Sequence, residues 1–552
     1  MYRNKNNALE YCDKEEGWVA ISSELSVVAR VRAQDKKSGY GACIEFVNMD
    51  LVPVRLVVPA NRILGSASNT LREELFDRGF WLEDEKYNWS LVLRYVRQQI
   101  KQAPSGISAF NTGWHDDVFV TTETTFGASE EPYFYAGAIV DSNFQVKGSL
   151  ANWQQEIGCL LSGNPTLIFA VGVALAAPLL APSGGESSVF HLMGSSSQGK
   201  SGAIYVGSSV YGSHSYKKTW YSTNNGIESV SVNYNDVMLP LDEIGMARSE
   251  NLDTAAYQIV NGDGKLRMLI TGALGKQAKW RTLVLSTGEV GLIDLLEEIG
   301  KKPAAGQLVR IVEIPLTEKY GCFSSIHRFN DSHEFAKHLE EATKKHYGSL
   351  FPAWMCLIVK QPDLELLLRS ETDRLMQRWK ESCMSAQVLR VLHRFCLVAV
   401  ALSLASRHKL VPWSEEESLF SVYSIFQRWI AARGHTQNHE EFEVLLALKR
   451  ALAKWEKQLS EISSGRSSNT GYFRRDGDEI QWLIHKNVFI RDLQLRKQYI
   501  SQLTPLVQRR WFESNEGARG TLRVKVNGKL ERFFAFTPDQ IIQELEELTA
   551  DA

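Results

Sequence analysis

Eight consecutive residues have the composition and spacing of a phosphate-binding loop. They read Gly194-Ser195-Ser196-Ser197-Gln198-Gly199-Lys200-Ser201 and fit the pattern G-x-x-x-x-G-K-[ST] without deviation. In such a loop the backbone N–H groups surround the phosphates of a nucleotide, the lysine reaches the β and γ oxygens, and the last hydroxyl holds Mg²⁺. We therefore expect a nucleotide and Mg²⁺ at this loop, with Lys200 and Ser201 as the active side chains.

An acidic pair follows the loop along the chain. The apolar run from Val237 to Leu241 ends in Asp242 and Glu243. At the end of a buried strand, one carboxylate can hold the Mg²⁺ shell and the next can polarise the water that attacks the γ-phosphate. We assign the first role to Asp242 and the second to Glu243, so the sequence predicts ATP hydrolysis. Pro240 within this run indicates a local sheet edge or a bulge.

Two later apolar runs carry further candidates. One ends at Ser286 and Thr287, where a hydroxyl can lie between Glu243 and the γ-phosphate; the pattern does not distinguish the two residues. Arg310 is the lone cation of the other run. Alternation can place it on a solvent-facing side, or in an oligomer it can reach the γ-phosphate of a neighbouring subunit as an arginine finger.

A basic stretch lies between the acidic pair and Ser286. It contains Lys265, Arg267, Lys276 and Lys279, with a Gly-x-x-Gly turn at 272–275. Two short strands around this turn would form a hairpin with Lys276 near its tip. In a ring, such tips line a pore and contact the phosphate backbone of DNA. The alternative is a basic hairpin that is only exposed to solvent.

The elements that must position these residues can be read from the hydrophobic pattern. Val189 to Met193 is expected as a buried strand before the loop, and a helix is expected after it. The apolar stretch from Thr166 to Pro182 is near the lower length limit of a membrane span, but it contains Pro178 and no basic flank. We interpret it as a buried helix and expect no membrane association.

Composition limits the class of protein. The chain has 552 residues, 44% of them hydrophobic, with a formal net charge of -2. This charge argues against a uniformly basic surface and leaves room for a local basic channel. The seven cysteines are scattered without a Cys-x-x-Cys pair, which favours a reducing compartment. The first residues lack an apolar core, so we expect no signal peptide and a cytoplasmic protein.

These patterns predict an α/β protein with several domains. We expect a mixed α+β N-terminal domain at 1–147, a phosphate-loop core at 148–331, a helical region at 332–459, a flexible linker at 460–471 and a small module at 472–552. In the last module, alternating residues on both sides of Asn527-Gly528 predict a β-hairpin. Helices followed by such a hairpin suggest a winged helix.

In order and spacing, the motifs resemble the domain-of-unknown-function-927 family, helicases of phages, plasmids and chromosomal islands. The resemblance covers nearly the whole chain. The residues that carry it are Gly113-Trp114, Gly163-Asn164-Pro165, Gly194 to Ser201, Trp220 to Thr223, Asn225 to Glu228, Leu241 to Glu243, Asn261-Gly262, Gly264-Lys265, Arg267, Ser286 to Glu289, Gly306-Gln307, Arg310 and the helix around Arg390.

The resemblance implies an AAA+ ATPase core with a helical lid, similar to replicative helicases of the minichromosome-maintenance type, which form hexameric rings on DNA. It favours Arg310 as an arginine finger acting on the neighbouring subunit, and Lys276, Lys265 or Lys279 as a pore residue. It also suggests Arg390 as a second sensor of the γ-phosphate. Arg390 and Arg394 share a helix face at i and i+4, so the alternative is a pair of arginines that snorkel from a buried helix.

One departure concerns the first sensor, where similar helicases carry Asn and this chain has Ser286-Thr287. The leading hypothesis is an ATP-dependent DNA helicase or translocase, a homo-hexamer that unwinds DNA during replication of a mobile genetic element. The alternative is an AAA+ ATPase that acts on DNA as a loader, remodeller or defence-system sensor without unwinding. A scaffold with a degenerate ATP site is disfavoured, because Lys200, Asp242 and Glu243 are present.

Overall fold

The computed structural model describes the chain except for residues 66, 138–143, 222, 247–248, 267–276, 299, 301–308, 477–478, 496–502, 504–505, 514–519 and 549–552. The chain divides into two compact units. The first comprises 1–302, 316–374 and 396–425, and the second 303–315, 375–395 and 426–552.

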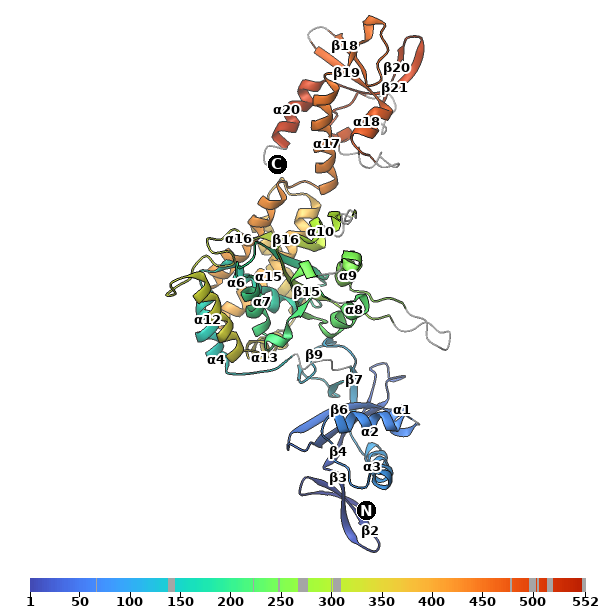
Figure 1. Ribbon diagram of the computed structural model, residues 1–552, viewed down its shortest axis with the longest axis vertical. Helices are drawn as coiled ribbons and strands as arrows, with labels where there is room; N and C mark the ends of the chain where they lie inside the picture. Colours follow the sequence, from blue (N-terminus) through green and yellow to red (C-terminus); the bar gives the residue numbers. More distant parts are fainter. Residues whose placement is uncertain are drawn as a thin grey trace. The chain divides into compact units, whose positions relative to one another are not determined.

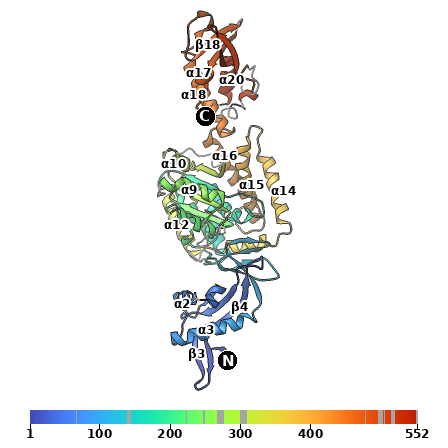
Figure 2. The same cartoon turned by 90° about the vertical axis from the view of Figure 1, so that its right-hand side faces the viewer.

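The N-terminal part of the first unit is built on a five-stranded sheet with the order β11-β7-β4-β5-β6. Its strands are β4 Leu25–Arg32, β5 Gly41–Val47, β6 Pro53–Pro59, β7 Ser105–Ala109 and β11 Tyr133–Tyr135. Three helices accompany it: α1 Ala60–Leu64, α2 Ser68–Asp77 and α3 Glu85–Ile100. Helix α3 lies against β4 and against β3 Gly17–Ser23 (Figures 1 and 2). Its apolar face buries Val92 and Val96 against Ile44 and Phe46 of the sheet, so one core holds helix and strands together.

Two smaller antiparallel sheets complete this part. One contains β1 Tyr2–Lys5, β2 Ala8–Asp13 and β3 Gly17–Ser23. The other contains β8 Gly113–His115, β9 Val118–Val120 and β10 Thr125–Phe126. The second sheet contacts the following core through Trp114, whose indole Nε1 donates a hydrogen bond of 2.7 Å to the carbonyl of Pro178.

The core of the first unit is a parallel sheet in which four consecutive strands have the order β13-β14-β15-β12. They are β12 Ser188–Met193, β13 Lys218–Thr219, β14 Val237–Asp242 and β15 Thr282–Gly288. Every residue of β14 and β15 is buried, as expected for strands covered on both faces. Among the described pairings, β13 covers only Leu241 and Asp242 of β14. Pro240 therefore lies at a local sheet edge on that side, as the sequence indicated.

The helices of the core are α4 Leu150–Trp153, α5 Cys159–Leu161, α6 Pro165–Ala176, α7 Lys200–Ser209, α8 Asn224–Asn233, α9 Ser249–Asn261 and α10 Leu292–Glu298. Helix α7 contacts both α6 and β15 (Figure 1). From Thr166 to Ala176 every residue of α6 is buried within the protein, which confirms the interpretation of this apolar stretch as a buried helix.

The region from 332 to 455 is helical. Its helices are α12 Ser332–Lys345, α13 Leu350–Ile358, α14 Leu364–Trp379, α15 Ala386–Arg407, α16 Glu415–Arg433 and α17 His439–Trp455. Among the described residues, α15 alone is both long and apolar enough to cross a membrane, and 78% of its apolar window is buried inside the protein. That burial is typical of a core helix.

The second unit contains β16 Ile311–Pro315 and, further on, a five-stranded sheet ordered β17-β18-β19-β21-β20. These strands are β17 Ser460–Glu461, β18 Gly471–Asp476, β19 Glu479–His485, β20 Leu522–Val526 and β21 Lys529–Phe536, and they are accompanied by α18 Lys486–Asp492 and α20 Pro538–Leu548. The hairpin of β20 and β21 is confirmed, because Val526 pairs with Lys529 around Asn527-Gly528, both at positive φ.

The segment 460–471 differs from the predicted flexible linker. Strand β17 pairs with β18, and the hydroxyl of Thr470 donates a hydrogen bond of 2.9 Å to Gln458. Its Ser- and Gly-rich composition serves turns within the sheet rather than a free tether. The winged-helix assignment and the other domain boundaries stay predictions.

Candidate nucleotide site

The phosphate loop joins β12 to α7, as predicted. Gly199 has a φ of +78°, and a Cβ atom there would lie 2.4 Å from the ring of Phe323. Only glycine fits both the left-handed backbone and the ring packed below it. The loop therefore ends at the N-terminus of α7. The first N–H groups of this helix lack intrahelical partners and can bind phosphate.

Lys200 folds back over this loop. Its Nζ donates hydrogen bonds of 2.6 Å to the carbonyls of Gly194 and Ser195. These contacts hold the ammonium group at the rim of the loop. Ser201, the next residue of α7, is exposed at the start of the helix, so its hydroxyl is available to a ligand.

A segment that sequence reasoning missed supports the loop from below. Leu316 N donates to Met193 O at 2.8 Å, and Cys322 N donates to Gln198 O at 2.8 Å. Phe323 is 1% exposed and lies beneath Gly199. Gly321 belongs to the same support. Gly321 has a φ of +77°, and a Cβ there would lie 2.4 Å from the carbonyl oxygen of Gln198.

Asp242 stands at the end of β14 in a shell of three donors. The residue is buried, with an exposed fraction of 3%. One oxygen, Oδ1, accepts hydrogen bonds from the Thr287 hydroxyl and, at 3.1 Å, from the backbone N–H of Glu243. The other, Oδ2, lies 2.9 Å from the Nζ of Lys217. These three donors satisfy the hydrogen-bonding capacity of the buried carboxylate.

Lys217 is a second residue that the sequence analysis did not identify. It directly precedes β13, and its ammonium lies 5.2 Å from the ring centroid of Tyr205 on α7. Burial disfavours the charged amine, but the hydrogen bond and the negative charge of Asp242, together with Tyr205, raise the pKa of Lys217 above its usual value. The residue is therefore a fixed cation beside the predicted metal ligand. No local motif predicts this pair, which forms because β13 runs beside β14.

Glu243 has a different environment from Asp242. It is exposed and has a φ of +58°, in the left-handed region. A non-glycine residue pays roughly 1–2 kcal/mol for this conformation, and such strain is found where a side chain must be aimed for function. The turn separates the two acids: Asp242 remains in the sheet, and Glu243 is presented to solvent. This arrangement suits a metal ligand followed by a residue that activates water.

Ser286 and Thr287 have different hydrogen-bond partners. Thr287 donates to Asp242. Ser286 is fully buried, accepts a hydrogen bond of 2.9 Å from the indole N–H of Trp220, and lies 2.9 Å from Nδ1 of His191. The structure therefore brings Thr287 to the acidic end of β14, and it places Ser286 in a buried polar network.

His191 completes this network on β12. Its Nε2 lies 3.0 Å from the carbonyl of Val290, so Nε2 carries the proton and Nδ1 accepts from Ser286. Complete burial lowers the pKa of His191 to about 4, and the hydrogen bond to Val290 opposes part of that shift. A neutral imidazole thus links β12, β15 and Trp220 next to the phosphate loop.

These groups meet because of the parallel register. Met193 pairs with Gly288, and Leu241 pairs with Ser286, so the carboxyl ends of β12, β15 and β14 lie at one edge of the sheet. Ligands of open α/β sheets bind outside this edge. The hydroxyl of Ser201 and the carboxylate of Asp242 are oxygen donors of the kind that Mg²⁺ prefers, and the loop amides and Lys200 suit a polyphosphate. The donor set therefore fits a magnesium nucleotide.

The other predicted basic residues are distributed as follows. Arg267 and Lys276 lie outside the described residues. Lys265 and Lys279 are exposed, and near them Gly264 N donates to Ala278 O at 2.8 Å. The described ends of the basic stretch therefore lie side by side, and the hairpin between them stays a prediction, because residues 267–276 lie outside the described residues.

The three arginines of the later segments belong to the second unit. Arg310 directly precedes β16. Arg394 on α15 donates to the carbonyl of Val309, the residue before Arg310. Arg390 is exposed on the same helix. Arg394 thus fixes the backbone next to Arg310, whereas Arg390 projects into solvent.

Two further motifs of the sequence have structural roles near the core. Gly113 and Trp114 dock on Asp236, which is fully buried. The N–H of Trp114 donates to it at 3.1 Å, and Arg281 pairs with it at 3.2 Å. Burial raises the pKa of Asp236, although Arg281 attracts its negative charge. Asn164, also fully buried, accepts the N–H groups of Ser324 and Ser325 at 2.9 Å, next to the segment that supports the phosphate loop.

Comparison with solved structures shows that this fold has a precedent over its whole length. SCCmec type IV Cch, described as an active helicase, superposes with a TM-score of 0.69 at 16% sequence identity, covering 98% of each chain. NtrX from Brucella abortus gives a TM-score of only 0.21 at 10% identity, over 65% of this chain and 75% of NtrX, too low to support an argument. No curated protein matches the sequence.

Family membership follows from the first half of the chain. Residues 1–280 of the 552 match the family described as Domain of unknown function (DUF927). The matched part includes the Gly113-Trp114 pair, the phosphate loop and the acidic end of β14. The chain belongs to the DUF927 family.

Proposed function

We propose that this protein is an ATP-dependent DNA helicase or translocase of a mobile genetic element, acting in the cytoplasm as a ring of identical subunits, most simply a hexamer. The observation that carries the proposal is the set of groups at one sheet edge: Lys200 and Ser201 at the phosphate loop, and Asp242 held by Thr287 beside Glu243. The full-length similarity in fold to a protein described as an active helicase supports it.

In this proposal the residues divide the work of ATP hydrolysis. Lys200 and the loop amides bind and orient the phosphates; Ser201 and Asp242 would hold Mg²⁺, which would supply positive charge to the phosphate oxygens. Glu243, exposed on its strained turn, accepts a proton from the attacking water. Thr287 keeps Asp242 aligned. Arg310 of a neighbouring subunit stabilises the charge that develops on the γ-phosphate, a contribution of roughly 10³-fold or more in comparable enzymes.

The positive charge of the predicted basic hairpin indicates DNA as the substrate. Lys265 and Lys279 are exposed at its base, and Arg267 and Lys276 continue it in sequence. The hairpin connects α9 to β15, and α9 follows the acidic end of β14. Movement at the nucleotide site can therefore pass to the hairpin through two short connections, so that hydrolysis moves a DNA backbone held by the lysines.

The proposal is tested with purified protein, single-stranded DNA and a forked duplex. Lys200→Ala should abolish both DNA-stimulated ATP hydrolysis and unwinding, because it removes the cation at the phosphate loop. Lys337→Ala, at an exposed position of α12, is the matched control and should retain both. Unwinding by Lys200→Ala at the wild-type rate would contradict the proposal. ATP hydrolysis that DNA neither stimulates nor couples to unwinding would favour a loader or remodeller instead.

A further inference from the structure

The N-terminal part of the first unit contains a concave site that the ATPase mechanism does not use. Its volume is about 740 Å³, and it lies where the ends of β4 and α3 meet α1 and the first residue of β7. Four of its lining residues are basic, namely Arg30, Arg32, Arg97 and Lys101, and none is acidic. Such a lining favours an anionic ligand.

The hydrogen bonding of the arginines leaves donors for that ligand. Arg32 pairs with Glu131 through Nη2 at 2.8 Å, but its Nη1 is buried without a partner among the described residues. An unsatisfied buried donor costs free energy, which an added acceptor oxygen recovers. Arg97 uses Nε and Nη2 on the carbonyl of Ile63, which fixes its position in the site. Lys101 is exposed at the end of α3.

The same site carries large apolar groups that face solvent. The exposed fraction is 55% for Tyr40 and 64% for Leu64, and both residues line the site. The hydroxyl of Tyr40 donates to the carbonyl of Lys36 at 2.9 Å, so the ring is tethered at its polar end. A tethered, exposed aromatic ring between cations is the arrangement on which nucleobases stack in proteins that bind single strands.

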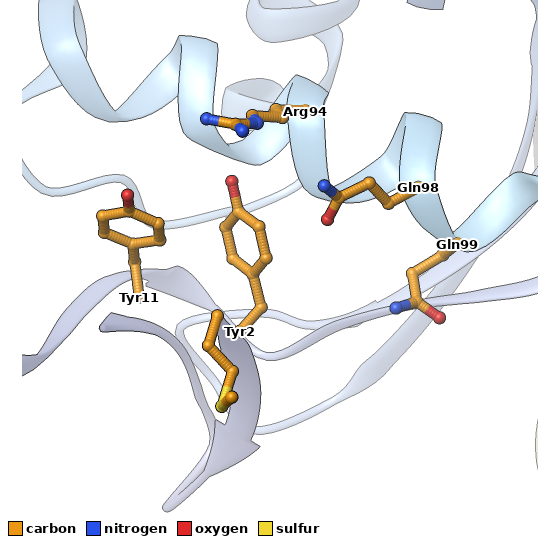
Figure 3. Close-up of a pocket in the computed structure, with 6 residues that line it drawn as sticks. Tyr2, Tyr11, Arg94, Gln98 and Gln99 are labelled. Atoms are coloured by element: carbon orange, nitrogen blue, oxygen red, sulfur yellow. The ribbon is translucent and has the colours of Figure 1, made fainter. Parts of the chain in front are cut away.

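The basic character continues along α3 beyond this site. Arg94, Arg97 and Lys101 are spaced i, i+3 and i+7, so they share one face of the helix. Arg94 lines a second, smaller hollow of about 300 Å³ with Tyr2, Tyr11, Gln98 and Gln99. Figure 3 shows Arg94 and Gln98 projecting from the helix toward the rings of Tyr2 and Tyr11.

This extent decides between a single anion and a chain of them. At 1.5 Å per residue, the face from Arg94 to Lys101 covers about 10 Å along the helix axis. One phosphate cannot contact cations that far apart, whereas successive phosphates of a strand can. A duplex keeps its bases stacked inside, where Tyr40 in a concave site cannot reach them, but a single strand exposes them.

We infer that this site binds single-stranded nucleic acid, with a base on Tyr40 and backbone phosphates on Arg30, Lys101 and Arg94. The inference goes beyond the proposed function, because it requires neither ATP nor the phosphate loop. Arg97, held by the carbonyl of Ile63, forms the fixed floor of the site, and Arg32, held by Glu131 through Nη2, offers its buried Nη1 to a phosphate oxygen.

The test measures binding of a fluorescein-labelled oligothymidylate to the full chain without nucleotide, by anisotropy over a range of salt concentrations. All variants are made in a Lys265→Gln/Lys279→Gln background, which weakens DNA binding by the basic hairpin of the ATPase core. Adding Arg30→Gln/Lys101→Gln should raise the Kd about tenfold or more and lower the salt slope by about 1.4, since each lost phosphate contact on a single strand accounts for about 0.7. Tyr40→Leu should raise the Kd at least fivefold without changing the slope.

The matched control is Lys5→Gln/Lys14→Gln, which removes two exposed cations of the same unit outside both hollows. Its Kd should stay within twofold of the background, and basal ATP hydrolysis should stay unchanged in every N-terminal variant, which verifies folding. Ultraviolet crosslinking of an iodouracil oligonucleotide should label the peptide that contains Tyr40. The inference would be overturned by equal Kd values for the site variants and the control, or by crosslinks confined to other segments. It would also be overturned if thymidine monophosphate competed as well as unlabelled oligothymidylate.

Discussion

At the scale of single residues, the nucleotide site depends on which hydroxyl meets Asp242. Ser286 and Thr287 are adjacent and chemically similar, yet only the second contacts the carboxylate. Successive side chains of a strand point to opposite faces of the sheet. The Ser286 hydroxyl therefore joins Trp220 and His191, and the Thr287 hydroxyl contacts Asp242 at the end of β14. The two positions should therefore fail in different ways when they are changed.

Thr287→Val should lower kcat for ATP hydrolysis about tenfold to a hundredfold, because Asp242 loses a donor that aligns it, and its effect on stability should be small. Thr287→Ser keeps the hydroxyl and should retain most of the activity. Ser286→Ala leaves the indole of Trp220 and the ring of His191 without a buried partner, so it should lower the free energy of unfolding by about 1–3 kcal/mol. Steady-state kinetics and thermal unfolding of the three variants separate the two roles; equal kcat losses for Thr287→Ser and Thr287→Val would contradict this assignment.

The buried imidazole of His191 makes the core sensitive to acid. Its pKa is about 4 in the folded protein against 6.5 for an exposed histidine. Between these values the unfolded chain binds more protons, so stability is complete above pH 6.5 and declines as the pH falls toward 4. The full loss corresponds to about 3 kcal/mol. His191→Gln removes this titration, so the fall in Tm between pH 7 and pH 5 should be smaller in the variant than in the wild type. Parallel Tm curves would show that His191 does not titrate as described.

At the scale of elements, the sequence predicts those parts whose chemistry is local. The phosphate loop, the helix after it, the acid at the end of β14 and the hairpin at Asn527-Gly528 each depend on residues close together in the chain. Lys217 and the 316–323 segment could not be predicted in this way, because they reach Asp242 and the loop only after β13 pairs with β14 and Leu316 bonds to Met193. The prediction of a flexible linker at 460–471 was partly wrong. Residues that form turns within a sheet have the same composition as a flexible linker, so composition alone does not distinguish them.

The segment below the phosphate loop gives a test at this scale. Gly321→Ala should raise the Kd for ATP about tenfold, because its Cβ would meet the carbonyl of Gln198 at 2.4 Å and shift the loop. Gly184→Ala is the matched control: its φ of +65° is similarly unfavourable, but nothing lies within 4 Å of the added atom. This control should lose only about 1 kcal/mol of stability, from the unfavourable backbone conformation. Calorimetric titration with ATP distinguishes the two, and equal affinities would show that the 316–323 segment does not set the shape of the loop.

At the scale of the whole molecule, the question is whether one chain contains a complete site. The phosphate loop and Asp242 belong to the first unit, and Arg310 belongs to the second. In a ring, Arg310 can serve the site of the adjacent subunit, and Arg394 would keep it in place by holding the carbonyl of Val309. If the site is divided between subunits in this way, ATP hydrolysis should require assembly.

Mixing two inactive variants tests this division. Lys200→Ala lacks a working phosphate loop but keeps Arg310, and Arg310→Ala lacks the finger but keeps the loop. If Arg310 acts on its neighbour, random assembly of equal amounts places an intact loop next to an intact finger at about a quarter of the interfaces. Hydrolysis should then recover well above that of either variant alone, since an arginine finger contributes roughly 10³-fold or more at each restored interface. If Arg310 acts within its own chain, each subunit carries one defect and mixing restores nothing. Activity equal to the mean of the two variants, in a mixture shown by size-exclusion chromatography to have exchanged subunits, would therefore exclude the shared site.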